Sequence, residues 1–180
     1  MLNKRTKILL TAFEPYGGND TNISQRVLDA IQADIAKLLL PVSFRRAPEV
    51  INEAIGQLQP DVIIAMGQTA ESDKIRLERL AINIMDSAKG DNDGYIPDEE
   101  IICSEVPLAL KTALPVKQLC AECINAGLPT KVSNSAGLYV CNRIYFEALR
   151  HTTNSLFVHI PKNMDVETTK QTIYQLIKFF

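Results

Sequence analysis

The sequence lacks any run of about 18 consecutive apolar residues, the length that a membrane-spanning helix requires. Its first apolar stretch follows a few charged residues and stops at Phe13, without the small-residue pattern of a signal-peptide cleavage site. We therefore expect no membrane association and a cytoplasmic location. The cysteines are then expected to be reduced thiols; they are Cys103, Cys120, Cys123 and Cys141.

The sequence also has little excess charge. Its 19 basic and 21 acidic residues give a formal net charge of −2, which offers no electrostatic reason to bind nucleic acid or anionic lipid. The dinucleotide pattern G-x-G-x-x-G, the Walker motif, H-E-x-x-H and G-x-S-x-G are all missing, so no cofactor is expected. Cys120 and Cys123 form a C-x-x-C pair inside a helical pattern, but zinc needs two further ligands and no second pair exists. We expect these two thiols to pack in a core, and we expect no metal site.

The chain of 180 residues has the size of one ordinary domain, and no linker, repeat or low-complexity tract divides it. Short apolar runs that end in turn formers indicate strands, and stretches of helical apolar spacing lie between them. The expected strands are 7–13, 42–44, 61–66, 76–85, 129–133 and 156–160, and the expected helices lie between Ser24 and Pro41 and over 49–58, 114–127, 139–151 and 166–179. Residues 89–100 are dense in turn formers and are expected to be loop. This alternation predicts one α/β domain over residues 1–180, a three-layer α/β/α sandwich around a mostly parallel twisted sheet.

Cys141 follows an expected strand and a Ser-Asn-Ser-Ala-Gly turn, and it lies in about the first turn of the next helix. A thiol in that place feels the positive end of the helix dipole, which favours the thiolate and lowers the pKa of the thiol. The free N–H groups there can also receive a developing oxyanion. A buried cysteine with a purely structural role is the alternative, and the position alone leaves it open.

The two histidines of the chain, His151 and His159, occupy different places. His151 ends a helix, where a cation stabilises the dipole, whereas His159 ends a strand at the edge where active-site loops gather. A cysteine and a histidine from adjacent β/α units are the usual nucleophile and base. Glu78 is a candidate for the carboxylate that orients the histidine, and an ordinary surface glutamate beside Arg79 is the alternative.

Several segments taken together resemble the signatures of one family, the pyroglutamyl peptidase I family of cysteine peptidases. The resemblance covers nearly the whole chain in the right order. It is carried by Thr11–Gly18 (TAFEPYGG), Gln59–Gln68 (QPDVIIAMGQ), Glu78–Asn83 (ERLAIN) with Asp91–Gly94 (DNDG), Ser133–Asn142 (SNSAGLYVCN) and Phe157–Pro161 (FVHIP).

The resemblance implies a cysteine exopeptidase that removes N-terminal pyroglutamate from peptides by acyl transfer through a thioester. It assigns Glu78, Cys141 and His159 as the catalytic triad. It also places Phe13 in the pocket for the pyroglutamyl ring, with further contacts from Tyr16, Gln68, Tyr139 and Val140. The implied fold is an α/β/α sandwich, and family members are often homo-oligomers, so a dimer or tetramer is possible.

The sequence departs from the family pattern in two places. The family usually has an arginine ten positions after the glutamate, and this sequence has Ala88 there, followed by Lys89. The chain also lacks several residues between Cys141 and His159. Two alternatives follow from these departures: a diverged enzyme that keeps the triad but cleaves another small amide, and a non-catalytic relative that serves binding.

Overall fold

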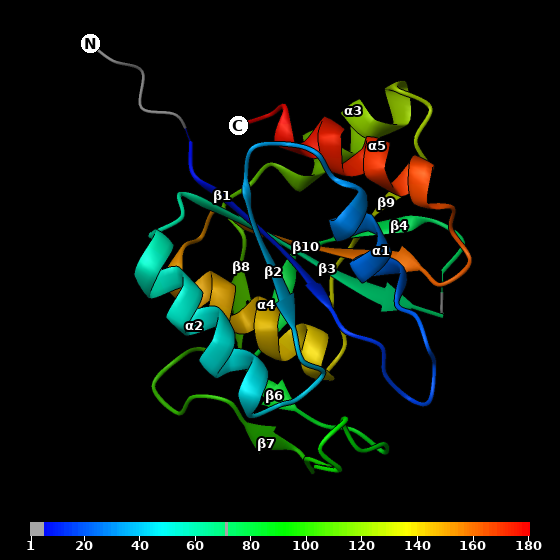
Figure 1. Ribbon diagram of the computed structural model, residues 1–180. Coiled ribbons are helices and arrows are strands. Elements are labelled where there is room, and N and C mark those ends of the chain that lie inside the picture. Colours follow the sequence, from blue (N-terminus) through cyan, green and yellow to red (C-terminus); the bar gives the residue numbers. More distant parts are fainter. Residues whose placement is uncertain (1–5, 71) are drawn as a thin grey trace.

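The computed structural model describes residues 6–70 and 72–180. Its main sheet consists of β1 (Ile8–Phe13), β2 (Ala36–Leu40), β3 (Val62–Thr69), β4 (Ile75–Glu78), β9 (Thr130–Ser133) and β10 (Ser155–Pro161). The strand order is β2-β1-β3-β10-β4-β9 (Figure 1). The first four strands in this order run parallel, while β4 is antiparallel to β10 and parallel to β9. The sheet is therefore mostly parallel, as the sequence predicts.

Helices cover both faces of this sheet, and each face has its own apolar layer. The helices α1 (Ile23–Ala30), α3 (Val116–Asn125) and α5 (Val166–Ile177) pack on one face. The helices α2 (Arg46–Leu58) and α4 (Val140–His151) pack on the other, as Figure 1 shows. The predicted three-layer α/β/α sandwich is confirmed.

Burial and capping explain why the main elements form where they do. All six residues of β1 are buried, because helices cover the strand on both faces. The side chain of Asn22 accepts a hydrogen bond from the N–H of Ser24, and that of Asp165 accepts one from Thr168, so α1 and α5 each begin at a capping residue. Cys120 and Cys123 lie on the buried face of α3, which confirms that these two thiols pack in the core.

The predictions for residues 24–44 were partly wrong. The helix that we expected to reach Pro41 ends at Ala30, and Ala36–Leu40 forms the edge strand β2. The apolar spacing fits a helix, but pairing with the open edge of β1 satisfies the backbone and buries Leu40 opposite Phe13. The strand expected over 42–44 is a turn, in which the N–H of Phe44 donates to the carboxylate of Asp91 at 2.8 Å.

The single strand expected over 76–85 is broken into three short ones. After β4, the pieces β5 (Leu80–Ile82) and β6 (Ile84–Met85) pair with β8 (Ala109–Lys111) and β7 (Glu100–Ile101) in two separate hairpin-like sheets. The break at Asn83 has a cause, because its side-chain amide donates to the carbonyls of Cys103 and Val106. The remaining expected strands and helices are found within a few residues of their expected limits.

The fold brings several segment ends to one edge of the sheet. Figure 1 shows β1, β3 and β10 pointing toward the side of the molecule on which α4 begins. Within residues 6–70 and 72–180, no helix combines the length and the apolar character needed to cross a membrane.

Candidate active site

The thiol of Cys141 lies directly above the backbone of Gly67. A Cβ atom built on Gly67 would lie 2.7 Å from Sγ of Cys141 and 2.8 Å from the ring of Phe157, so only glycine leaves room for them there. Gly67 is the register partner of His159 on the neighbouring parallel strand, about 4.8 Å away. Register partners present their side chains to the same face, so the thiol lies on the face of the sheet that carries the imidazole.

His159 is fixed by a buried carboxylate. Its Nδ1 lies 2.9 Å from Oε1 of Glu78, and the two side chains are 5% and 0% exposed. A carboxylate accepts a hydrogen bond, so Nδ1 carries the proton and Nε2 is left to accept one from a thiol. The ring of Phe157 packs against the imidazole with centroids 4.7 Å apart and holds its plane.

Glu78 is positioned by both of its neighbouring elements. It pairs with Phe157 across β4 and β10, and Tyr145 of α4 donates its hydroxyl proton to the backbone carbonyl of Glu78 at 2.9 Å. The expectation that this glutamate could be an ordinary surface residue beside Arg79 is wrong, because its side chain has no exposed surface. Glu78, His159 and Cys141 thus lie together on the α4 face of the sheet.

The electrostatic environment of Cys141 differs from the expectation. Burial, followed by the charge of Glu78, raises the pKa of the Cys141 thiol above its ordinary value. Arg76 and the backbone N–H at the start of α4 lower it by less. The prediction of a lowered pKa was therefore wrong: the helix terminus is present, but desolvation outweighs it. The resting residue is a thiol that needs a base.

The five residues expected in the ring pocket fall into two groups by exposure: two are buried and three are half-buried. Phe13 and Val140 are 2% and 1% exposed and belong to the apolar layer under α2 and α4. Tyr16 and Tyr139 are half-buried, with ring centroids 6.3 Å apart. Gln68 lies at the end of β3, where its Oε1 accepts a hydrogen bond from the N–H of Ile23 at 3.2 Å. Phe13 ends β1, Tyr139 and Val140 directly precede Cys141 at the start of α4, and Gln68 follows Gly67 on β3.

The tyrosine hydroxyls of this region are close to the thiol. Burial raises the pKa of Tyr16, the charge of Cys141 raises it further, and a hydrogen bond with the side chain of Gln68 lowers it. Burial also raises the pKa of Tyr139, to about 12. Both phenols are therefore neutral hydrogen-bonding groups at neutral pH.

Ala88 and Lys89 lie on the exposed part of a loop, and the next residue of that loop, Gly90, accepts a hydrogen bond from the hydroxyl of Tyr139 at 3.1 Å. The backbone N–H of Lys89 donates to Oγ of Ser87, and its carbonyl accepts from the same hydroxyl. The cation that lies beside the predicted triad belongs to a different residue, Arg76 of β4, whose Nε lies 3.2 Å from Oε1 of Glu78.

Sequence reasoning overlooked three residues that build this site. Gly67 and Asn142 were noted only as members of the segments that carry the family resemblance, and Arg76 only as the start of the strand expected over 76–85. The amide of Asn142 accepts from the N–H of Ile82 and donates to the carbonyls of Ile82 and Ile84, which ties the start of α4 to the segment after Glu78. The position of Asn142 directly after the candidate nucleophile was the one available signal.

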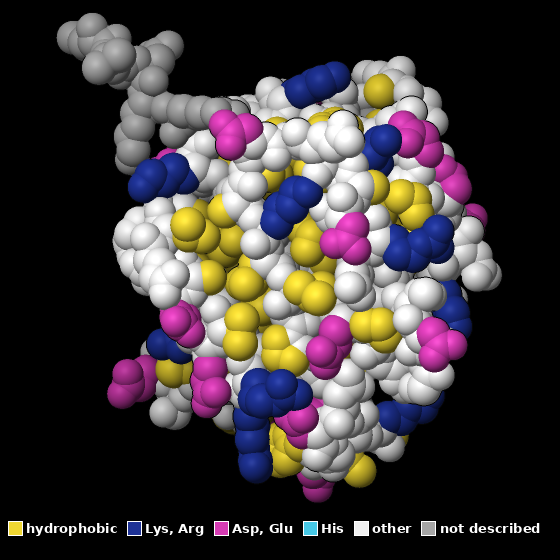
Figure 2. Space-filling model, in the orientation of Figure 1, with side chains coloured by type: hydrophobic (Ala, Val, Ile, Leu, Met, Phe, Trp, Pro, Cys, Tyr) yellow, Lys and Arg dark blue, Asp and Glu magenta, His cyan; other side chains and the backbone are white. Residues whose placement is uncertain are grey.

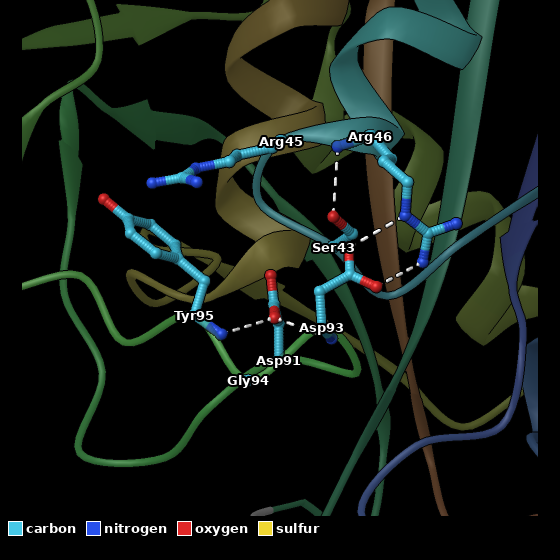
Figure 3. A pocket seen from close by; sticks show the side chains of 7 residues that line it. All are labelled: Ser43, Arg45, Arg46, Asp91, Asp93, Gly94 and Tyr95. Atoms are coloured by element: carbon cyan, nitrogen blue, oxygen red, sulfur yellow. Dashed lines mark hydrogen bonds and ion pairs between the residues drawn. The ribbon is translucent and has the colours of Figure 1, made fainter.

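A separate polar hollow of about 390 Å³ lies between the start of α2 and the loop at 91–95. Figure 3 shows the Arg46 side chain turned toward the carboxylate of Asp93, with Nε 2.8 Å from Oδ2. None of the predicted catalytic or ring-pocket residues lines this hollow. In the part of the chain that the structure describes, no three His, Cys, Asp or Glu side chains are grouped so that they could hold a metal ion.

Comparison with known proteins gives a consistent result. The sequence profile of the family described as pyroglutamyl peptidase matches residues 6–172. The pyrrolidone-carboxylate peptidase of Thermococcus kodakarensis is 39% identical over 166 residues, which cover 86% of this chain and 81% of that protein. The one from Thermococcus onnurineus is 40% identical over 167 residues, covering 86% and 83%.

Solved structures agree with these relatives. The pyrrolidone carboxyl peptidase of Fervidobacterium islandicum superimposes with a TM-score of 0.91 at 31% identity, covering 97% of each chain. A mutant of the pyrrolidone carboxyl peptidase of Pyrococcus furiosus gives a TM-score of 0.90 at 29% identity, covering 96% of this chain and 97% of the other.

Proposed function

This chain belongs to the pyroglutamyl peptidase family, and we propose that it removes N-terminal pyroglutamate from peptides through a thioester on Cys141. It is a cysteine-type peptidase, and we propose His159 as its base and Glu78 as the carboxylate behind the base. The observation that carries this proposal is the position of Sγ of Cys141 above Gly67, on the face that holds the hydrogen-bonded pair of His159 and Glu78.

The proposed reaction has two stages. Nε2 of His159 takes the thiol proton as Sγ of Cys141 attacks the carbonyl carbon of the pyroglutamyl residue. The N–H groups in the first turn of α4 stabilise the oxyanion. The imidazolium then protonates the leaving amine, the C–N bond breaks, and a thioester remains. Water, activated by the same histidine, hydrolyses the thioester and releases pyroglutamate.

The proposed ring pocket lies between Phe13, Tyr16, Gln68, Tyr139 and Val140. A five-membered lactam is small and flat, so aromatic walls suit its faces, and its single N–H and C=O need only a few polar partners. Two polar groups that could meet the lactam are the hydroxyl of Tyr16, which interacts electrostatically with Cys141, and the amide of Gln68, to which that hydroxyl is hydrogen-bonded. Family membership does not favour the alternatives of a diverged amidase or a binding relative.

A fluorogenic pyroglutamyl amide tests this proposal against the same fluorophore attached to proline, which lacks the lactam carbonyl. We expect hydrolysis of the pyroglutamyl compound only. Cys141→Ala should reduce turnover by at least about a thousandfold, while Cys103→Ala, which removes a thiol outside the proposed site, should retain most of it. Equal turnover by the Cys141→Ala protein would rule out the mechanism.

We further propose that the enzyme works in the cytoplasm and associates with copies of itself. A thiol nucleophile has to stay reduced, which a cytoplasmic location provides. Figure 2 shows apolar side chains gathered on the face that carries the edge strand β2, and Leu39 of that strand is 42% exposed. Light scattering on wild type and Leu39→Lys tests the association: a lower mass for the variant supports it, and a monomeric wild type contradicts it.

A further inference from the structure

Arg76 contacts both members of the pair behind the proposed nucleophile. Its Nε lies 3.2 Å from Oε1 of Glu78, and one of its terminal nitrogens lies 3.4 Å from Nδ1 of His159. Arg76 and His159 are directly opposite each other on the antiparallel strands β4 and β10. Only 17% of the arginine side chain is exposed, so its charge acts in a largely dry environment.

The geometry defines what this arginine does to the pair. Oε1 of Glu78 accepts from Nδ1 of His159, so Nδ1 holds its proton and has no lone pair for the guanidinium. The contact between Arg76 and the imidazole is therefore a contact between a cation and a ring, and it opposes a second proton on that ring. The other carboxylate oxygen of Glu78, Oε2, is buried without a hydrogen-bond partner among the described residues. Arg76 is thus a cationic partner of this buried carboxylate.

The same charge reaches the nucleophile. Arg76 favours the thiolate of Cys141 and opposes the effect of Glu78 on it. Among the described residues, Arg76 and Glu78 of β4 act on the thiol and contact the imidazole, Tyr16 after β1 and Tyr139 before α4 interact with the thiol, and Tyr145 of α4 binds the backbone of Glu78. Burial raises the pKa of each of these tyrosines, so they stay neutral around neutral pH. Of these described side chains, Arg76 is the one that carries a permanent positive charge.

We propose that Arg76 is a positioning residue of the active site, which shares Oε1 of Glu78 with His159 and supplies a positive charge that favours the Cys141 thiolate and opposes a second proton on the imidazole. The role of Arg76 in catalysis rests on the proposed function. Its effect on the Cys141 thiolate does not depend on the substrate, because the rate of alkylation of the thiol measures that effect directly.

Two substitutions separate the charge of Arg76 from its packing. Arg76→Gln removes the charge and keeps an N–H donor for Glu78, whereas Arg76→Lys keeps the charge. The rate of iodoacetamide labelling of Cys141, measured by mass spectrometry across pH, should fall about tenfold at pH 8 in Arg76→Gln and stay within about threefold of wild type in Arg76→Lys. The acidic limb of kcat/KM should move to higher pH in Arg76→Gln, because a proton on His159 is then no longer opposed.

Arg79→Met is the matched control, since it removes the neighbouring arginine of the same segment, and neither profile should move. Circular dichroism establishes that each variant is folded, and Arg76→Met is the second neutral variant should Arg76→Gln not fold. Labelling and pH profiles of a folded neutral variant that match those of wild type would overturn the proposal. A wild-type protein without pyroglutamyl hydrolysis would instead contradict the proposed function, while the labelling comparison would still decide the role of Arg76.

Discussion

Sγ of Cys141 lies 2.7 Å from the point that a Cβ atom on Gly67 would occupy. The nucleophile proposed here therefore depends on the absence of a side chain on the neighbouring strand. Gly67 is also the register partner of His159, so a side chain at position 67 would project from the face of the sheet that carries the imidazole.

Gly67→Ala should displace the thiol from the imidazole. The added methyl group would meet both Sγ of Cys141 and the ring of Phe157 at less than 3.0 Å, so one of them has to move. We expect kcat/KM to fall by about a hundredfold or more, since small misplacements of reacting groups are costly. Gly56→Ala is the control: Gly56 lies on an exposed part of α2 with nothing within 4 Å of its added methyl. That change should leave kcat/KM unaltered and raise the free energy of unfolding by about 0.5–1 kcal/mol. Similar kinetics for both variants would contradict the geometry described here.

The pH dependence of thiol labelling should reflect the raised pKa of Cys141. Because burial and Glu78 disfavour the thiolate, labelling by iodoacetamide should be slow at neutral pH and should keep rising into the alkaline range. Glu78→Gln should make labelling faster at a given pH, since it removes the negative charge that opposes the thiolate. Mass spectrometry of the labelled peptides gives both rates. A labelling rate that is already constant below pH 7 would show that the thiolate is the resting form.

Glu78→Gln should nevertheless slow catalysis. A glutamine cannot stabilise the imidazolium that forms when His159 takes the thiol proton, so kcat should fall by about a hundredfold or more with little change in KM. Glu53→Gln is the control, because Glu53 lies on the exposed side of α2, where its carboxylate accepts a hydrogen bond from the side-chain amide of Gln57. Faster labelling together with slower turnover would be a signature that a simple loss of folding does not produce. An unchanged kcat would remove Glu78 from the mechanism.

The loop at Ala88 offers a further test. Lys89 is exposed, so Lys89→Ala should leave kcat within about twofold of wild type, as expected for a surface change. If position 88 faces the developing negative charge, Ala88→Arg should raise kcat by up to about a hundredfold and change KM less. Kinetics of the three proteins on one chromogenic pyroglutamyl amide decide the matter. Damage from Lys89→Ala with no gain from Ala88→Arg would show that Lys89 already performs this role.

The sequence alone determined the central strands of the sheet and the candidate residues for the nucleophile and the base. Short apolar runs followed by turn formers identified β1, β3 and β10, because strands covered on both faces have to be apolar throughout. Cys141 was chosen from its place at the start of a helix, and His159 from its place near the end of β10. These features are local, so a single sequence carries them.

The errors lie where local pattern and long-range pairing compete. The apolar spacing between Ile31 and Leu38 suits a helix, yet the free edge of β1 turned Ala36–Leu40 into a strand. The segment after Glu78 reads as one continuous strand, yet its Asn83 side chain binds the backbone of Cys103 and Asn142 binds the backbone of Ile82. Its two halves pair with two different strands. Hydrogen bonds between residues 20 to 60 positions apart leave no periodic trace in the sequence.

Only the tertiary structure decided how the charges meet. Glu78 is a surface-type residue by composition and has no exposed surface because β4 inserts next to β10. That antiparallel insertion places Arg76 opposite His159, and the carboxylate of Glu78 contacts both. Burial raises the pKa of the Cys141 thiol, whereas its position at the start of a helix had predicted a lowered pKa. Desolvation depends on every atom packed around a group, whereas the sequence around Cys141 shows only the helix that follows it.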